Sequence, residues 1–258
     1  MPGKYGHFCW YELMTTDTPA AERFYRSVVG WGAQAQDANY TLLTAGEQPV
    51  AGLMPWAEGR PAWIGYISVQ DVDAAVAEIP QKGGALHRPP ADIPDVGRFA
   101  VVADPQGAVF VVMQPDPYLP PPEVPMGTPG HVGWTELNAA DGPTALPFYA
   151  AQFGWTEAEF PPVDGPLGGE QPEPMFYQLF STVGHGGMSG GIGTKPPQAP
   201  VPHWLFYFNV DDIDAATERV RAGGGQVLLE PMEVPGGGWI INAVDPQGAM
   251  FALTGPRV

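Results

Sequence analysis

Cysteine is almost absent from the sequence: Cys9 is the single one among 258 residues, so no intramolecular disulfide can form. Long apolar runs are also missing. No stretch of about 18 apolar residues occurs, and a helix needs roughly that length to span a bilayer. The first residues carry no apolar segment typical of a secretory signal. We therefore expect a soluble cytoplasmic protein.

Basic residues are scarce as well. The 11 Lys and Arg residues stand against 28 Asp and Glu residues, which gives a formal net charge of −17. Such a surface repels phosphate backbones and anionic membranes, so we expect neither a nucleic-acid partner nor a membrane partner. The field of the protein favours neutral or cationic small ligands instead.

The chain contains an internal repeat. Residues 6–13 (GHFCWYEL) recur at an offset of 124 as residues 130–137 (GHVGWTEL). Farther along the offset becomes 141, and the segment DPQGA at 104–108 recurs unchanged at 245–249. The extra residues of the second copy fall largely within 155–175, which is rich in Pro, Gly and acidic residues. We interpret this stretch as a loop insertion in a duplicated module.

A proline-rich segment separates the two copies. Such a segment is extended and semi-rigid, and it cannot pair as a central strand. The sequence therefore predicts a first domain at 1–116, a linker at 117–129 and a second domain at 130–258.

Each copy contains a pattern of strands and helices that occurs twice within it. In the first copy, residues 8–14 are predicted as a strand, and Asp17 or Thr18 can cap the helix that follows. A second helix opens at Asp71, and a closing hairpin crosses the DPQG turn at 104–107. The pattern predicts an α+β fold of two tandem domains. Each is built from paired βαβββ modules that form a curved sheet around a cavity.

Three segments resemble one known family. They are the helix AAERFY at 20–25 that ends in Gly30 and Trp31, the segment VQDVDAA at 69–75, and the DPQG turn at 104–107. With their counterparts in the second copy, they resemble the vicinal-oxygen-chelate superfamily of glyoxalases, bleomycin-resistance proteins and extradiol dioxygenases. The closest likeness is to its two-domain "hydroxylase" or "antigen" homologues. The resemblance covers nearly the whole chain outside the linker and implies glyoxalase-like domains.

The resemblance also implies where a metal would be held. Catalytic members take ligands from the first strand, the last strand and, in dioxygenases, the strand before the second helix. The matching positions of the two copies are Trp10, Ile64 and Val111, then Trp134, Leu205 and Ala252. None of these side chains can bind a metal, so we expect no cofactor. A displaced site for a divalent metal stays open, with donors from Glu12, Glu136, His131 and His203.

A carboxylate and two aromatic residues remain on the predicted inner face of the first copy. Trp10 and Glu12 share that face because side chains alternate along a strand, and the half-repeat offset adds Tyr66.

The second copy presents the corresponding set. Its members are Trp134, Glu136 and Tyr207, and strand parity adds His203. We take Glu12 and Glu136 as candidate catalytic residues and the others as candidate ligand-binding residues.

A functional and a structural interpretation of these sets stay open, and the functional one has two forms. Burial would raise the pKa of Glu12 or Glu136, so that the carboxyl could act as a general acid or base. It could equally hold a cationic ligand, with a cation–π contact worth roughly 0.5–2 kcal/mol from the neighbouring tryptophan. Alternatively, each glutamate pairs with an arginine or backbone group, and the tryptophan only fills the core.

The sequence thus predicts a small-molecule-binding protein of the glyoxalase and bleomycin-resistance type without the usual metal site. One alternative is a glyoxalase-like lyase or isomerase that uses Glu12 or Glu136 as a proton shuttle. An extradiol-type dioxygenase is a third, which the missing ligands oppose. The fused copies can replace the homodimer of single-copy relatives, so we expect a monomer or a weak homodimer.

Overall fold

The computed structural model describes residues 5–118, 124–159, 176–182 and 187–258. Part of the predicted linker, 119–123, and most of the predicted insertion, 160–175, lie outside the described residues. Within the described part, no helix combines the length and apolar character needed to cross a bilayer.

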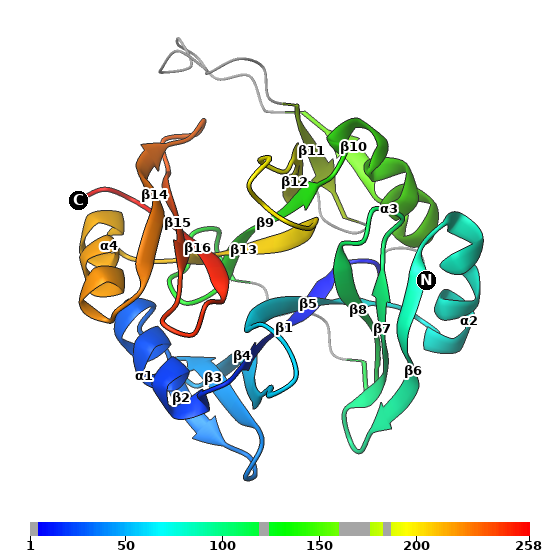
Figure 1. The fold of residues 1–258 in the computed structure, drawn as a ribbon, viewed down its shortest axis with the longest axis horizontal. Coiled ribbons are helices and arrows are strands. Elements are labelled where there is room, and N and C mark those ends of the chain that lie inside the picture. Colours follow the sequence, from blue (N-terminus) through cyan, green and yellow to red (C-terminus); the bar gives the residue numbers. More distant parts are fainter. Residues whose placement is uncertain (1–4, 119–123, 160–175, 183–186) are drawn as a thin grey trace. The chain divides into compact units, whose positions relative to one another are not determined.

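The first copy forms one eight-stranded sheet in the order β2-β3-β4-β1-β5-β8-β7-β6 (Figure 1). Its elements in chain order are β1 (Phe8–Thr15), α1 (Thr18–Val28), β2 (Gly32–Ala35), β3 (Thr41–Ala45), β4 (Gln48–Pro55), β5 (Ala62–Ser68), α2 (Val72–Glu78), the 3-10 helix η1 (Pro80–Lys82), β6 (Ala85–Ile93), β7 (Gly97–Ala103) and β8 (Val109–Pro115). This order is two successive βαβββ modules.

The second copy repeats this order in a second sheet, β10-β11-β12-β9-β13-β16-β15-β14. Its elements are β9 (Val132–Ala139), the 3-10 helix η2 (Gly142–Thr144), α3 (Leu146–Phe153), β10 (Thr156–Ala158), β11 (Tyr177–Ser181), β12 (Gly190–Thr194), β13 (His203–Asn209), α4 (Ile213–Ala222), β14 (Gln226–Glu233), β15 (Trp239–Val244) and β16 (Met250–Gly255). The α+β fold of tandem, paired βαβββ modules predicted from the sequence is confirmed.

Helix α1 shows how local sequence fixes an element. The Asp17 carboxylate accepts a hydrogen bond from the backbone N–H of Ala20 at 2.9 Å, so Asp17 and not Thr18 is the N-cap. The helix buries the apolar stripe predicted by its 3.6-residue period, Ala21, Phe24, Tyr25 and Val28.

The compact units of the protein combine halves of the two copies. One unit comprises residues 1–9, 65–122 and 135–204, and the other comprises 10–64, 123–134 and 205–258. We call them unit 1 and unit 2. Each therefore contains the first half of one copy and the second half of the other. The sequence repeat divides the chain into two successive copies. The contacts between residues divide it instead into two units that each combine parts of both copies.

A buried tyrosine joins the two copies inside unit 2. The Tyr25 hydroxyl on α1 donates to the Asp245 carboxylate at 3.1 Å and accepts from Trp63 Nε1 at 2.8 Å. The Trp31 indole donates to the carbonyl of Gly130 at 2.7 Å. Burial, with the nearby carboxylate of Asp245, raises the pKa of Tyr25, so its phenol stays protonated and keeps donating.

Unit 1 repeats these bonds with the roles of the copies exchanged. The Tyr149 hydroxyl on α3 donates to Asp104 at 2.9 Å, and the Trp155 indole donates to the carbonyl of Gly6 at 2.6 Å. The DPQG turn of each copy thus docks the first helix of the other copy. Around these bonds pack the aromatic cores of the units, in which Trp155 stacks on Phe180 at 4.4 Å between ring centroids.

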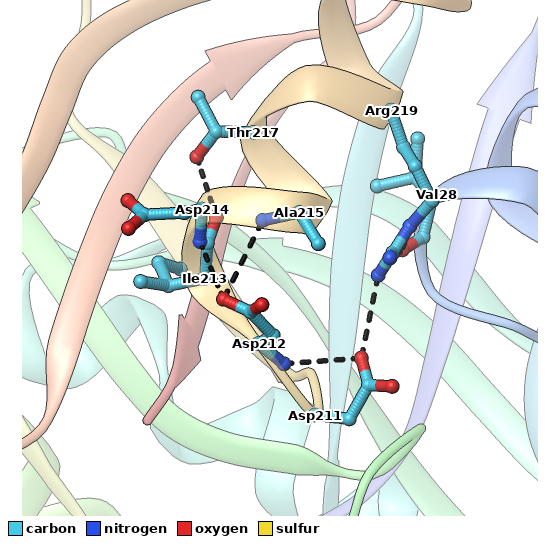
Figure 2. A network of polar contacts seen from close by, with 8 residues as sticks. All are labelled: Val28, Asp211, Asp212, Ile213, Asp214, Ala215, Thr217 and Arg219. Carbon is cyan, nitrogen blue, oxygen red and sulfur yellow. Dashed lines mark hydrogen bonds and ion pairs between the residues drawn. The ribbon is translucent and has the colours of Figure 1, made fainter. Parts of the chain in front are cut away.

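In each unit, a basic side chain caps the C-terminal end of the docked helix, which is α1 in unit 2 and α3 in unit 1. In unit 2, Arg219 of α4 donates from Nε and Nη2 to the carbonyl of Val28 at 3.2 and 3.1 Å, and Asp211 accepts from Arg219 at 3.4 Å. Figure 2 shows Arg219 extending from α4 toward Val28 and Asp211. In unit 1, Lys82 donates to the carbonyl of Ala151 at 2.9 Å. Both contacts place positive charge at the negative end of a helix dipole.

The Arg219 contact leads to a first prediction. Arg219→Met keeps most of the side-chain volume but removes the cap, so it should lower the free energy of unfolding by about 1 kcal/mol. Arg221→Met makes the same change in charge and removes only exposed ion pairs with Glu218 and Glu230. It should cost about 0.5 kcal/mol or less. Urea unfolding of both variants checks this, and equal losses would contradict it.

Candidate functional site

The two candidate glutamates occupy equivalent places in the two sheets. In the first copy, β1 runs parallel to β4 with Glu12 opposite Gly52. In the second copy, β9 runs parallel to β12 with Glu136 opposite Gly191. Each glutamate therefore lies beside a glycine on the neighbouring strand, which leaves room above that strand for a side chain from elsewhere.

A tyrosine that precedes β3 fills this room in the first copy. Trp10 Nε1 donates to the Tyr40 hydroxyl at 3.1 Å, and that hydroxyl is hydrogen-bonded to the Glu12 carboxylate. A Cβ on Gly52 would lie 2.1 Å from the Tyr40 hydroxyl oxygen and 3.1 Å from Glu12 Oε1. We call Trp10, Glu12, Tyr40 and Gly52 the first acid site; all four residues belong to unit 2.

The electrostatics of the first acid site keep the phenolic proton on Tyr40. Glu12 is 7 % exposed. Burial and then the negative charge of Glu12 raise the pKa of Tyr40 well above its usual value, whereas the hydrogen bond from Trp10 opposes the shift. The Tyr40 phenol is therefore protonated at neutral pH. It accepts from the indole and donates to the carboxylate, which orients all three groups.

The second copy builds a related arrangement in unit 1. The Tyr177 hydroxyl donates to Glu136 Oε2 at 3.0 Å, and Asn138 Nδ2 donates to Glu136 Oε1 at 3.3 Å. A Cβ on Gly191 would lie 2.1 Å from the Tyr177 hydroxyl oxygen. We call Glu136, Asn138, Tyr177 and Gly191 the second acid site. It is more open than the first, because Tyr177 is 45 % exposed and Glu136 is half-buried.

The positions expected to ligate a metal in the second copy do lie together. Trp134 packs against the buried cluster of Leu205, Tyr207 and Ala252, and Tyr207 pairs with Ala252 across β13 and β16. The three positions that the resemblance assigns to ligands hold Trp134, Leu205 and Ala252, whose side chains carry no metal donor, so they do not fit the metal of the catalytic members.

In the first copy, the positions expected to ligate a metal also hold side chains without a metal donor. Tyr66 of β5 pairs with Val111 of β8, and Trp10 belongs to the first acid site. Among the described residues, no three His, Cys, Asp or Glu side chains are grouped so that they could hold a metal ion.

The remaining predicted site residues fall in separate places. His203 begins β13 in unit 1, is half-buried, and has Nδ1 3.1 Å from the carbonyl of Val201; burial lowers its pKa. Tyr66 lies in unit 1 whereas Glu12 lies in unit 2, and Tyr207 lies in unit 2 whereas Glu136 lies in unit 1.

The sequence interpretation missed the two tyrosines that bond the glutamates. A signal for them exists: Tyr40 opens YTLL, and Tyr177 opens YQLF. The insertion in the second copy shifts the repeat offset between these segments, which hid the match. Trp10 and Glu12, which alternation along the first strand assigns to one face, both bond the Tyr40 hydroxyl.

Two tandem copies of paired βαβββ modules, with an acid on the first strand of each copy, define a glyoxalase-type α+β protein. The Glyoxalase/Bleomycin resistance protein/Dioxygenase superfamily model matches residues 4–112 and 130–253, and the chain belongs to this superfamily.

Two curated relatives match this chain over nearly their whole length. The putative glyoxylase CFP32 of Mycobacterium tuberculosis is 34% identical, with 96% of this chain and 94% of the relative covered. The anthracycline biosynthesis protein DnrV of Streptomyces peucetius is 31% identical, with 95% and 91% covered.

Solved structures share the fold at low identity. The Mn(II)-bound glyoxalase from Novosphingobium aromaticivorans has a TM-score of 0.65 at 18% identity, and the match covers 99% of this chain and 83% of that one. The 2,3-dioxygenase LapB from Pseudomonas sp. KL28 has a TM-score of 0.63 at 13% identity, with 98% and 92% covered. These likenesses extend to the fold alone.

Proposed function

We propose that this chain binds a small organic ligand at the first acid site, without a metal at the positions that catalytic members of the superfamily use. The observation that carries the proposal is the ordered chain from Trp10 through Tyr40 to the buried Glu12 carboxylate. A buried carboxylate is costly to the fold, and it interacts strongly with hydrogen-bond donors because little water competes for its oxygens. Trp10 adds aromatic surface to the same site.

The apolar cluster in the second copy supports the part of the proposal that concerns the metal. Trp134, Leu205 and Ala252 replace the expected ligands with side chains that pack against one another. For the same reason we do not propose ring-cleaving dioxygenase chemistry. Two relatives named for anthracycline biosynthesis make an anthracycline a suitable first probe.

This proposal predicts binding that is independent of metal. Exhaustive treatment with a strong chelator should leave the affinity for a fluorescent anthracycline unchanged, because no metal ligand lies at the expected positions. Fluorescence titration measures the affinity, and elemental mass spectrometry confirms that the metal is gone. An affinity that falls on chelation and returns with Mn²⁺ or Fe²⁺ would contradict the proposal.

Lyase or isomerase chemistry is the second candidate, and the first acid site also favours it. A carboxylate beside a protonated phenol can take a proton from one atom of a carbonyl substrate and return it to another. Relatives named as putative glyoxylases point to the same chemistry. Turnover of a 2-oxoaldehyde–thiol adduct that disappears in Glu12→Gln would favour this candidate over binding alone.

A further inference from the structure

We infer that a cleft in unit 1 is a further ligand site, which takes a planar aromatic cation such as an amidine. The cleft lies at the turn between β6 and β7, beside the end of β8, and its volume is about 580 Å³. Small-molecule pockets commonly have volumes of about 300–1,000 Å³. The residues that line it fall within 92–117, so the cleft belongs to unit 1, whereas the first acid site belongs to unit 2. The inference therefore goes beyond the proposed function.

The corresponding place in the second copy holds two stacked side chains. Cross-strand pairing sets Arg98 of β7 opposite Gln114 of β8. In the same way it sets Trp239 of β15 opposite Gly255 of β16, so Trp239 is the counterpart of Arg98. The Arg257 guanidinium lies over the Trp239 ring, with Cζ 4.4 Å from the ring centroid. The second copy thus fills this place with a cation on an aromatic face.

The first copy has neither member of that stack. The counterparts of the tryptophan and the arginine are Arg98 and Asp116, and both line the cleft. Arg98 donates to Asp73 from Nε and Nη2 at 2.8 and 3.0 Å, and to Asp92 from Nη1 at 2.8 Å. These bonds hold the guanidinium at the wall of the cleft. None of the described residues that line the cleft is aromatic.

The charges of the cleft favour a cation. Asp92, Asp95 and Asp116 line it together with Arg98, and Arg98 is neutralised by its ion pairs with two carboxylates. Asp95 and Asp116 are exposed, and in the described part of the chain neither side chain forms an ion pair or accepts a hydrogen bond. A cation that enters the cleft therefore meets two carboxylates that no protein cation occupies. The net charge of −17 adds to the attraction.

The walls of the cleft favour a flat ring. A guanidinium has a planar face on which an aromatic ring stacks, and the second copy makes this contact within the protein. Ile93 and Val96 add apolar surface to the lining, and Val96 is 50 % exposed. An amidinium presents paired N–H donors in the plane of such a ring, and carboxylates accept them as they accept those of arginine. The ligand class is therefore an aromatic amidine or a related aromatic cation.

Benzamidine tests the charge of the site in the whole chain. Isothermal titration calorimetry should show binding, and Asp95→Asn combined with Asp116→Asn should weaken it at least about 5-fold. The matched control, Glu47→Gln combined with Glu58→Gln, removes two exposed carboxylates of unit 2. It should change the affinity by less than about 1.5-fold, because salt screens distant charges. No binding to the unaltered chain, or equal losses in the two double variants, would overturn the inference.

Two analogues of benzamidine test the ligand class. Benzamide is planar but uncharged, so it should bind more weakly, and the variants of Asp95 and Asp116 should not affect it. Cyclohexanecarboxamidine keeps the cation but has no flat ring to stack on Arg98, so its affinity should be at least about 3-fold lower. Binding as tight as that of benzamidine would show that no ring stacks in the cleft.

A variant of the other site keeps the two proposals apart. Gly52→Ala forces Tyr40 from its place in the first acid site, where the new Cβ would lie 2.1 Å from the hydroxyl oxygen. Benzamidine binding should be unchanged in this variant, because Gly52 belongs to unit 2 and the cleft to unit 1. Weaker benzamidine binding in Gly52→Ala would place the probe at the first acid site and overturn the inference.

Discussion

Asp104→Ala should lower the free energy of unfolding by about 4 kcal/mol, one of the two largest effects expected in this chain. The carboxylate is 3 % exposed and accepts three hydrogen bonds. Oδ1 accepts from the backbone N–H groups of Gln106 and Ala108, both at 2.9 Å, and Oδ2 accepts from the Tyr149 hydroxyl at 2.9 Å. The variant leaves all three donors without this acceptor, two of them in buried surroundings, and each such loss costs about 1–3 kcal/mol.

Two companion variants separate the turn from the docked helix. Tyr149→Phe removes the bond to α3 but keeps the turn, so it should cost about 1.5 kcal/mol. Asp104→Asn keeps the acceptor of the turn, and its amide can donate to the Tyr149 hydroxyl, so its cost should be intermediate. Chemical unfolding measures all three. A loss in Tyr149→Phe as large as in Asp104→Ala would show that the turn bonds contribute nothing.

Gly52→Ala should weaken anthracycline binding at least about 10-fold, and this second large effect concerns function. The new methyl group would lie 2.1 Å from the Tyr40 hydroxyl oxygen and 2.7 Å from its Cζ, far inside contact distance. Tyr40 would have to leave its place between Trp10 and Glu12, which removes the order of the first acid site. Stability should change little, because the atoms that clash are the far end of a side chain that can rotate away.

Gly191→Ala is the matched control. It creates the same clash with Tyr177, 2.1 Å from the hydroxyl oxygen, in the second acid site. Binding should be unaffected because the proposed ligand site is the first acid site. Fluorescence titration compares the two variants. Unchanged affinity in Gly52→Ala would show that the position of Tyr40 has no part in binding.

Local patterns predicted the parts of the candidate site that depend on one strand. Alternation along β1 placed Trp10 and Glu12 on one face, and both side chains meet the Tyr40 hydroxyl. Tyr40 itself was not predicted. Its place depends on the parallel register of β1 with β4, which sets Gly52 opposite Glu12 and opens the space that the phenol fills. A helix and a hairpin separate β1 from β4 in the chain, so no short sequence pattern indicates how the two strands align.

The DPQG turn is a second example of a contact that local sequence does not predict. Its residues predict a tight turn, and Asp104 does accept the backbone bonds that make one. Nothing in the four residues indicates that the other oxygen of the same carboxylate docks the helix that carries Tyr149 in the second copy. The turn sequence recurs unchanged in both copies, and the structure shows that each one has this second partner.

The sequence by itself determined the duplication and the order of strands and helices, because periodicity and comparison of the repeats show these features residue by residue. The positions expected to ligate a metal came from the resemblance to the superfamily, and the residues at these positions, such as Trp10 and Val111, are visible in the sequence. Only the tertiary structure decided which halves pack together. Tyr25 bonds Asp245 across 220 positions of the chain, so each compact unit takes half of each copy. Such pairing depends on burying surfaces that meet only after folding, and two similar repeats are compatible with either arrangement.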